Sequence, residues 1–208
     1  MVIFFLFKTL SPTTTTESSR IPAISAVRLL PSPPQPNAPP PPLYNLPRPI
    51  ILDTNLRLST TCKILKNFQA GTGRRPWVFC APLNDARISK EQIQVLNERK
   101  QGLQTAGARI FEVDSCKSQN GDRLSISSLL ATLRSNGIKS LMVEGGAHVI
   151  GSFLSEPIVD KIVITIAPVL VGDAGVGYRL PNADLKETFK EVHTETLGKD
   201  TVIALTSL

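Results

Sequence analysis

The residues best suited to chemistry lie within positions 140–154, where the sequence reads SLMVEGGAHVIGSFL. An apolar strand, an acidic residue, two glycines and an apolar helix follow one another there. Glycines let a backbone approach a ligand closely, and a helix start offers unpaired N–H groups at the positive end of its dipole. The spacing therefore predicts an anion site, with a pyrophosphate over the backbone of Gly145, Gly146, Ala147 and His148.

The same segment also has a purely structural interpretation. Two glycines between a strand and a helix are a common packing device, and they are not the G-x-G-x-x-G fingerprint of the doubly wound dinucleotide fold. Glu144 lies at the carboxyl end of its strand, where open α/β sheets bind ligands, so it either binds a substrate or caps the helix. For His148 we favour a role of the backbone over a role of the imidazole.

A second glycine-rich stretch, at 159–178, reads VDKIVITIAPVLVGDAGVGY. A β-branched strand leads into Ala-Pro and then into a loop with Gly172, Gly175 and Gly177. Loops of this kind often border a ligand cleft, and a plain connection between elements is the alternative. His193 lies in a charged segment and is expected at the surface.

Other chemistries lack a matching pattern. Ser, His and Asp occur without a nucleophile elbow, which disfavours a hydrolase. The sequence has no P-loop and no signature of a zinc nucleobase deaminase. The three cysteines, Cys62, Cys80 and Cys116, match no zinc spacing and are too scattered for a disulfide framework. We therefore expect no metal site and a reducing compartment.

Alternating strands and helices must position these residues. Short apolar runs predict strands at 50–52, 77–80, 108–113, 140–143, 161–167 and 201–206. Helical patterns cover 90–101, 125–133 and 147–154. This order indicates an α/β domain with a largely parallel sheet between helices. An antiparallel edge is expected where 162–166 and 202–205 lack a long helix between them.

The first 50 residues differ in composition from the rest. They hold 12 of the 17 prolines, whereas all 13 glycines lie at Gly71 or beyond. They also contribute +3 of the net charge of +6, so the pI of about 9.4 does not indicate that the folded part binds nucleic acid. The proline-rich positions 30–49 fit an extended spacer or loop, with a docking site for an SH3 or WW domain as the alternative.

No apolar run approaches the roughly 20 residues that a membrane span requires. The longest, at 2–7, ends at Lys8 and lacks the features of a secretory signal. Residues 9–30 are rich in Ser and Thr, as in a mitochondrial presequence, but show no sustained amphipathic period. We expect a cytoplasmic protein without a membrane partner, irregular at 1–45 and folded at 46–208.

Three motifs resemble the riboflavin-biosynthesis reductase family. PRPIILD at 47–53 is similar to its PRPIIxD strand, LMVEGGAHVI at 141–150 to its VxVEGGxxVI unit, and 159–172 to its VDxxxxxIAPxxxG segment. The resemblance covers about residues 46–208 and is closest to the stand-alone fungal members. It implies a dihydrofolate-reductase-like fold with a mixed, mostly parallel central sheet, and a homodimer.

The implied activity is NADPH-dependent reduction of the ribosylamino side chain of 2,5-diamino-6-(ribosylamino)pyrimidinone 5′-phosphate to a ribitylamino chain. The nicotinamide would carry the chemistry, and the protein would bind and orient both ligands. By position, the family's NADPH phosphates would lie along Gly145, Gly146, Ala147 and His148. Thr54 would lie on the cofactor side of the cleft.

For the substrate, the resemblance implies that Glu144 faces it and makes Arg28 a candidate for its phosphate. Arg74 and Arg75 are candidates for the 2′-phosphate of NADPH, from charge alone. No residue is assigned as the proton donor, so the catalytic residues stay unknown.

The N-terminal part departs from the family. Residues 1–24 contain neither the S-L-D-G-like turn nor the G-T-x-x-x-D segment of its members. The chain is therefore expected to be N-terminally truncated and to lack a central strand and part of the NADPH site. A catalytically silent dimerisation partner is the alternative function. Dihydrofolate reduction itself is disfavoured by the Glu-Gly-Gly motif.

Overall fold

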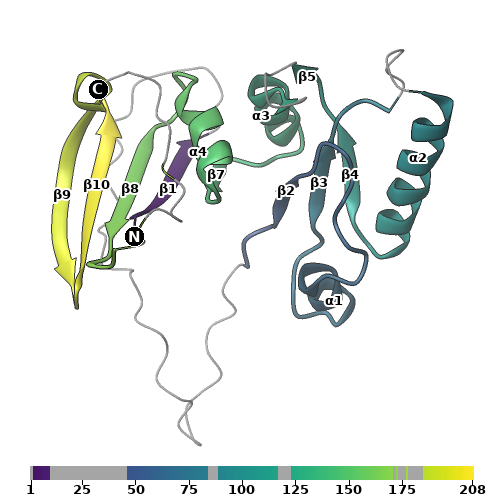
Figure 1. Ribbon diagram of the computed structural model, residues 1–208, viewed down its shortest axis with the longest axis horizontal. Helices are drawn as coiled ribbons and strands as arrows, with labels where there is room; N and C mark the ends of the chain where they lie inside the picture. Colours follow the sequence, from purple (N-terminus) through teal and green to yellow (C-terminus); the bar gives the residue numbers. More distant parts are fainter. Residues whose placement is uncertain are drawn as a thin grey trace, which may run out of the picture. The chain divides into compact units, whose positions relative to one another are not determined.

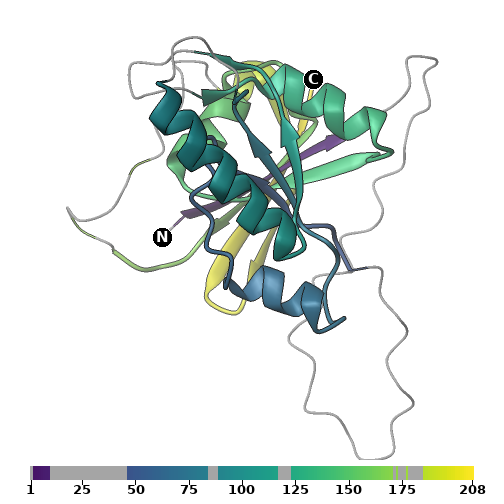
Figure 2. The same cartoon turned by 90° about the vertical axis from the view of Figure 1, so that its right-hand side faces the viewer.

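A computed structural model describes residues 2–9, 46–83, 89–116, 123–170, 172, 177 and 185–208, with the backbone alone at 2–9 and at Lys186 (Figures 1 and 2). Two compact units make up the chain. The first unit is formed by Pro12–Arg123, and the second by Met1–Ser11 with Leu124–Leu208. In the described ranges no helix is both long and apolar enough to cross a membrane.

The first unit contains a parallel sheet with the order β2-β3-β4. Its strands are β2 (Ile50–Leu52), β3 (Trp77–Cys80) and β4 (Arg109–Glu112). Helix α1 (Lys63–Gln69) connects β2 to β3, and α2 (Lys90–Thr105) connects β3 to β4. All four residues of β3 are buried, as expected for a central strand between covered faces.

Helix α2 begins at a capping box and lies along one face of this sheet (Figure 2). The Ser89 side chain accepts a hydrogen bond from the Gln92 N–H, and the Gln92 side chain accepts one from the Ser89 N–H. The buried core of the unit joins residues of the β2 loop, both helices and the sheet: Leu56, Leu65, Val78, Cys80, Leu83, Leu103 and Ala108.

The second unit contains a five-stranded sheet with the order β7-β1-β8-β10-β9, in which every neighbouring pair is antiparallel. The strands are β1 (Val2–Thr9), β7 (Ser140–Val143), β8 (Lys161–Ile166), β9 (Phe189–Leu197) and β10 (Asp200–Ser207). Its helices are α3 (Ile126–Ser135), α4 (Ala147–Leu154) and α5 (Leu185–Thr188). Buried side chains of α3 and α4 include Leu129, Leu133, Ile150 and Phe153.

A separate two-stranded sheet pairs β5 (Ser115–Cys116) with β6 (Arg123–Leu124). The α/β class is confirmed, and the predicted strands and helices lie within a few residues of the observed ones. Among the described residues, parallel pairing is found in β2, β3 and β4 alone, so the expectation of a mostly parallel central sheet is wrong: the larger sheet is antiparallel. The predicted antiparallel pairing of β8 with β10 is confirmed.

Strand β1 corrects the expectation of an irregular N-terminal segment. Its sequence VIFFLFKT forms a strand that pairs with β7 on one side and β8 on the other. The sheet of the second unit therefore has β1 as an interior strand between β7 and β8, where a strand was expected to be missing. A continuous apolar run is typical of a strand whose two faces are both covered.

Candidate functional site

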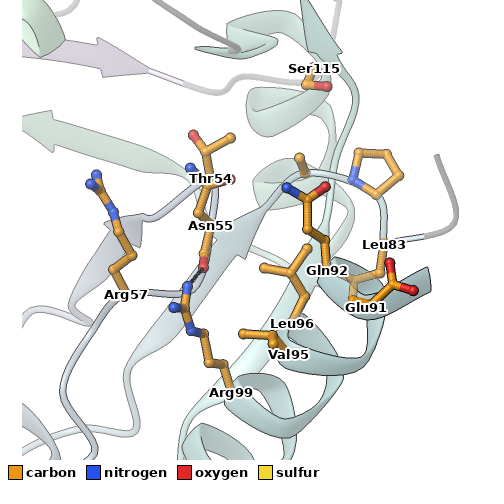
Figure 3. Close-up of a pocket in the computed structure, with 12 residues that line it drawn as sticks. Thr54, Asn55, Arg57, Leu83, Glu91, Gln92, Val95, Leu96, Arg99 and Ser115 are labelled. Carbon is orange, nitrogen blue, oxygen red and sulfur yellow. Dashed lines mark hydrogen bonds between the residues drawn. The ribbon is translucent and has the colours of Figure 1, made fainter. Parts of the chain in front are cut away.

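A cavity of about 530 Å³ lies at the carboxyl end of the parallel sheet (Figure 3). Open α/β sheets bind their ligands at this end, and ligand pockets commonly measure roughly 300–1,000 Å³. The lining residues come from the loops after β2 and β3, from α2 and from β5: Thr54, Asn55, Arg57, Ala81, Pro82, Leu83, Glu91, Gln92, Val95, Leu96, Arg99 and Ser115.

The loop after β2 is held in shape by Asp53. Its carboxylate accepts a hydrogen bond from the Leu58 N–H at 2.7 Å, and its carbonyl accepts one from the Leu56 N–H at 3.1 Å. Leu56 has a φ of +53°, an uncommon conformation for leucine, and is only 1% exposed. Burial of the Leu56 side chain offsets this strain, and its neighbours Asn55 and Arg57 line the cavity.

The cavity lining carries two cations, Arg57 and Arg99, and one carboxylate, Glu91. Arg99 Nη1 donates to the Asn55 carbonyl at 3.1 Å, which ties α2 to the β2 loop (Figure 3). Hydrogen bonds from its own N–H and from Ser89 lower the pKa of Glu91, so this exposed carboxylate is ionised at neutral pH. Positive charge exceeds negative charge in the lining, which suits a phosphate ester.

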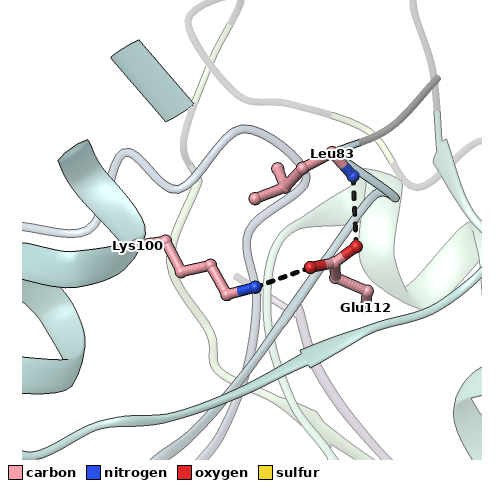
Figure 4. A network of polar contacts seen from close by, with 3 residues as sticks. All are labelled: Leu83, Lys100 and Glu112. Carbon is pink, nitrogen blue, oxygen red and sulfur yellow. Dashed lines mark hydrogen bonds and ion pairs between the residues drawn. The ribbon is translucent and has the colours of Figure 1, made fainter. Parts of the chain in front are cut away.

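A small polar network holds the loop after β3 (Figure 4). Glu112 Oε2 accepts a hydrogen bond from the Leu83 N–H at 3.2 Å, and Glu112 Oε1 pairs with Lys100 Nζ at 2.7 Å. Partial burial raises the pKa of Glu112, but the hydrogen bonds from Lys100 and Leu83 outweigh it and the net shift is downward. Glu112 is therefore ionised and fixes Leu83 at the cavity wall.

In the second unit, the segment of the predicted anion site lies between β7 and α4. Gly145 has a φ of +151°, which favours glycine, and Gly146 is the N-cap of α4 with a φ of −72°. The N–H groups of Ala147 and His148 make no hydrogen bond to another described residue. Glu144 is exposed directly before the turn. The predicted strand–turn–helix geometry is confirmed, and the binding roles stay predictions.

The structure thus brings five of the predicted residues together in one turn, from Glu144 to His148. Thr54 lies in the other unit and lines the cavity. Arg28 lies outside the described residues. Arg74 and Arg75 precede β3, so they are at the opposite end of the parallel sheet from Thr54.

Sequence patterns missed Arg57 and Arg99 as cavity residues. The one local signal that could have identified Arg57 is its place five positions after a predicted strand. Arg99 lies on a helix, and no sequence motif marks it as a cavity residue. Most of the glycine loop at 171–178 lies outside the described residues. His193 is exposed as expected and lies 3.2 Å from Glu195.

The three cysteines are free thiols that differ in burial. Burial raises the pKa of the Cys80 thiol to about 12, with a further contribution from Glu112, so it is a neutral core residue. Cys62 and Cys116 are free thiols. Within the same residues, no group of three or more His, Cys, Asp or Glu side chains is placed to hold a metal ion.

The family model and the relatives found by comparison with known proteins agree with one another. The family model of the RibD C-terminal domain matches residues 24–203. The riboflavin biosynthesis protein RibD of Bacillus amyloliquefaciens is 33% identical over 59% of this chain and 28% of its own length. The 2,5-diamino-6-ribosylamino-4(3H)-pyrimidinone 5′-phosphate reductase of Candida glabrata is 30% identical over 65% of this chain and 49% of its own length. The chain thus spans less than half of the length of either relative.

Solved structures show the same fold. The riboflavin biosynthesis reductase Rib7 of Saccharomyces cerevisiae aligns with a TM-score of 0.55 and 22% identity, over 78% of this chain and 70% of that chain. RibD of Acinetobacter baumannii aligns with a TM-score of 0.51 and 20% identity, over 80% of this chain and 41% of that chain. The dihydrofolate-reductase-like fold that the motifs imply agrees with these neighbours. Because the family model covers most of its length, this chain belongs to the RibD C-terminal domain family.

Proposed function

We propose that this chain reduces the ribosylamino side chain of 2,5-diamino-6-(ribosylamino)pyrimidinone 5′-phosphate with NADPH, in riboflavin biosynthesis. Family membership supports a reductase, and relatives from Candida glabrata and Schizosaccharomyces pombe are named for this pyrimidinone phosphate. The observation that carries the proposal is the Glu-Gly-Gly turn at the exposed start of α4. When bound, NADPH supplies a hydride to C1′ of the opened, imine-like sugar.

The β7–α4 turn suits a phosphate of the dinucleotide. No side chain projects from Gly145 or Gly146, and the N–H groups of Ala147 and His148 are unused by other described residues. The helix dipole adds favourable potential for an anion. Glu144 is assigned to the substrate, because its exposed carboxylate can accept hydrogen bonds from hydroxyl or amino groups. Its role is to orient the sugar for hydride transfer.

NADPH is the cofactor that the resemblance to the family implies, and the cavity of the first unit, taken by itself, carries positive charge that suits a phosphate group. Arg57 and Arg99 line the cavity beside Thr54, and Glu91 is the one carboxylate among the described lining residues. Arg74 and Arg75, the candidates for the 2′-phosphate from charge, lie at the other end of the parallel sheet from this cavity. The hydroxyl of Thr54 supplies a further donor at the cavity wall.

The deciding experiment measures NADPH consumption by the purified full chain with the ribosylamino substrate, with dihydrofolate and with no substrate. Turnover with the first alone supports the proposal, whereas turnover with dihydrofolate or with neither contradicts it. NADPH and NADH binding is measured in parallel on Arg57→Gln. We expect about tenfold weaker NADPH binding and unchanged NADH binding, because one charged hydrogen bond to the 2′-phosphate is lost. Lys63→Gln, on the exposed surface of the same unit, is the matched control.

A catalytically silent dimerisation partner is the second candidate, since residues 1–208 contain no G-T-x-x-x-D segment. It predicts NADPH consumption only after a second, active copy is added. We propose a homodimer for the active enzyme and a mixed dimer with an active copy for the silent partner. A molar-mass measurement in solution distinguishes the two, and cell fractionation tests the proposed location in the cytoplasm. The three free cysteines are compatible with that reducing compartment.

A further inference from the structure

Four arginines gather at the amino ends of the parallel strands, at the opposite end of the sheet from the cavity. We call them the arginine cluster: Arg48 before β2, Arg74 and Arg75 before β3, and Arg109 at the start of β4. The acidic residues nearest to these strands in the sequence, Asp53 and Glu112, lie at the carboxyl ends of β2 and β4. The sheet therefore has one basic end and one end with the cavity and the carboxylates.

Aromatic rings hold two of these guanidinium groups in place. The Arg48 guanidinium lies 4.7 Å from the centroid of the Trp77 ring, and that of Arg109 lies 5.2 Å from the same ring. Arg109 also lies 4.7 Å from the Phe111 ring. Stacking uses the face of a guanidinium and orients the N–H donors at its edge, so less side-chain entropy is lost when an oxyanion binds.

Backbone carbonyls position three of the four arginines without neutralising them. Arg75 donates to the carbonyls of Gly107 at 2.9 Å and Ala108 at 3.2 Å, and Arg48 Nη1 donates to the Arg75 carbonyl at 2.8 Å. Arg74 has one long bond, of 3.4 Å, to the Leu46 carbonyl. These acceptors are dipoles, so among the described residues they do not neutralise the charges of Arg48, Arg74 and Arg75.

The electrostatic surroundings of Arg48 agree with this geometry. Burial lowers its pKa, and the neighbouring Arg74, Arg109 and Arg75 lower it further, in that order. No carboxylate within the described residues is among the groups that shift it. The repulsion between Arg48 and its neighbouring arginines destabilises the folded chain, and a bound anion would relieve this repulsion.

We propose that the arginine cluster binds a small multivalent phosphate ligand, at a site separate from the cofactor cavity. Guanidinium groups recognise phosphate oxygens through paired N–H donors, and Arg48 and Arg74 present theirs from adjacent strand ends. The N–H groups of Trp77 and Arg109 are already bonded to the carbonyls of Pro49 and Pro76. The arginine side chains, and not these backbone N–H groups, would therefore bind the phosphate ligand, and the fluorescence of Trp77 would report its binding.

The test uses Trp77 as a built-in reporter, because it is the chain's single tryptophan. Sodium tripolyphosphate is titrated into the full chain at constant ionic strength, and tryptophan fluorescence is followed. We expect a saturable change, with at least about tenfold weaker binding in Arg74→Gln and in Arg48→Gln, since each loses a charged donor. Thermal unfolding checks that both variants fold, and Arg74→Gln decides the matter if Arg48→Gln does not fold.

Two controls separate this site from other cationic surfaces. Lys63→Gln removes a positive charge from exposed α1, and Arg57→Gln removes one from the cavity. Both should bind tripolyphosphate as the unmodified chain does. A response that never saturates, an unchanged affinity in Arg74→Gln, or a loss confined to Arg57→Gln would overturn the proposal, and the last would assign the anion to the cavity.

Discussion

Replacing Gly146 by aspartate should separate anion binding from helix stability, because the two should change in opposite directions. Gly146 is the N-cap of α4 with a φ of −72°, a conformation open to any residue. A Cβ built at this position meets no atom within 4 Å. The substitution therefore introduces no clash, and its carboxylate occupies the space where the phosphate is proposed to bind.

The expected magnitudes follow from the cap position. An N-cap aspartate satisfies a free N–H and interacts with the helix dipole, so the free energy of unfolding should rise by a few tenths to about 1 kcal/mol. Two unit negative charges about 4 Å apart repel by about 4 kcal/mol at an effective dielectric constant near 20. Cofactor affinity should therefore fall by roughly a thousandfold.

Gly146→Asn is the matched control, because asparagine has nearly the same size and caps a helix equally well without a charge. Calorimetric titration with NADPH and thermal unfolding are measured on both variants. We expect a large loss of affinity in the aspartate variant, a small one in the asparagine variant, and unfolding temperatures at or above that of the unmodified chain. Equal affinities in the two variants would refute a phosphate at the start of α4.

Three further predictions concern stability. Glu112→Gln should lower the free energy of unfolding by about 1 kcal/mol at neutral pH. Because the folded-state pKa of Glu112 is lowered, this difference in stability should persist at any pH above the unfolded-state pKa and should vanish as the pH falls through the folded-state pKa. Urea titrations of both proteins at a series of pH values measure it. A difference that does not depend on pH would contradict the prediction. Gly107→Ala should destabilise the protein more than Gly137→Ala. Both glycines have a positive φ, but only a Cβ at position 107 would clash, at 2.7 Å from the Phe68 ring. Thermal unfolding compares the two variants, and equal losses of stability would argue against the contact with Phe68. Phe5→Pro removes an N–H from a central strand and should disrupt the five-stranded sheet, whereas Phe5→Leu keeps that N–H; equal circular dichroism melts would show that β1 is dispensable.

Local patterns predicted most elements of the fold because their signals are contained within a few residues. The apolar runs of β3 and β7 and the Gly-Gly start of α4 are of this kind. Strand β1 was missed because its partners are distant, as in the pairing of Leu6 with Val143. No local feature states which of two far-apart apolar runs will pair. Helix α1 was missed because its N-cap, Cys62, makes no side-chain capping bond.

The same distinction applies to the candidate site. The turn from Glu144 to His148 could be recognised because all of its residues are consecutive. The cavity could not, since Arg99 meets the β2 loop across 44 positions of sequence, through the carbonyl of Asn55. Every residue has a backbone carbonyl, so a hydrogen bond to one cannot be predicted from the types of side chain in the sequence.

The position of β1 between β7 and β8 also sets the order in which the parts of the chain can fold during protein synthesis. Its eight residues are synthesised before the whole first unit, yet they pair with β7 and β8, which are synthesised after it. The nested first unit can fold while VIFFLFKT still waits for its neighbours. An unpaired apolar β-strand is prone to aggregate, so the interval between its synthesis and that of β8 is the period in which chaperone protection would matter most.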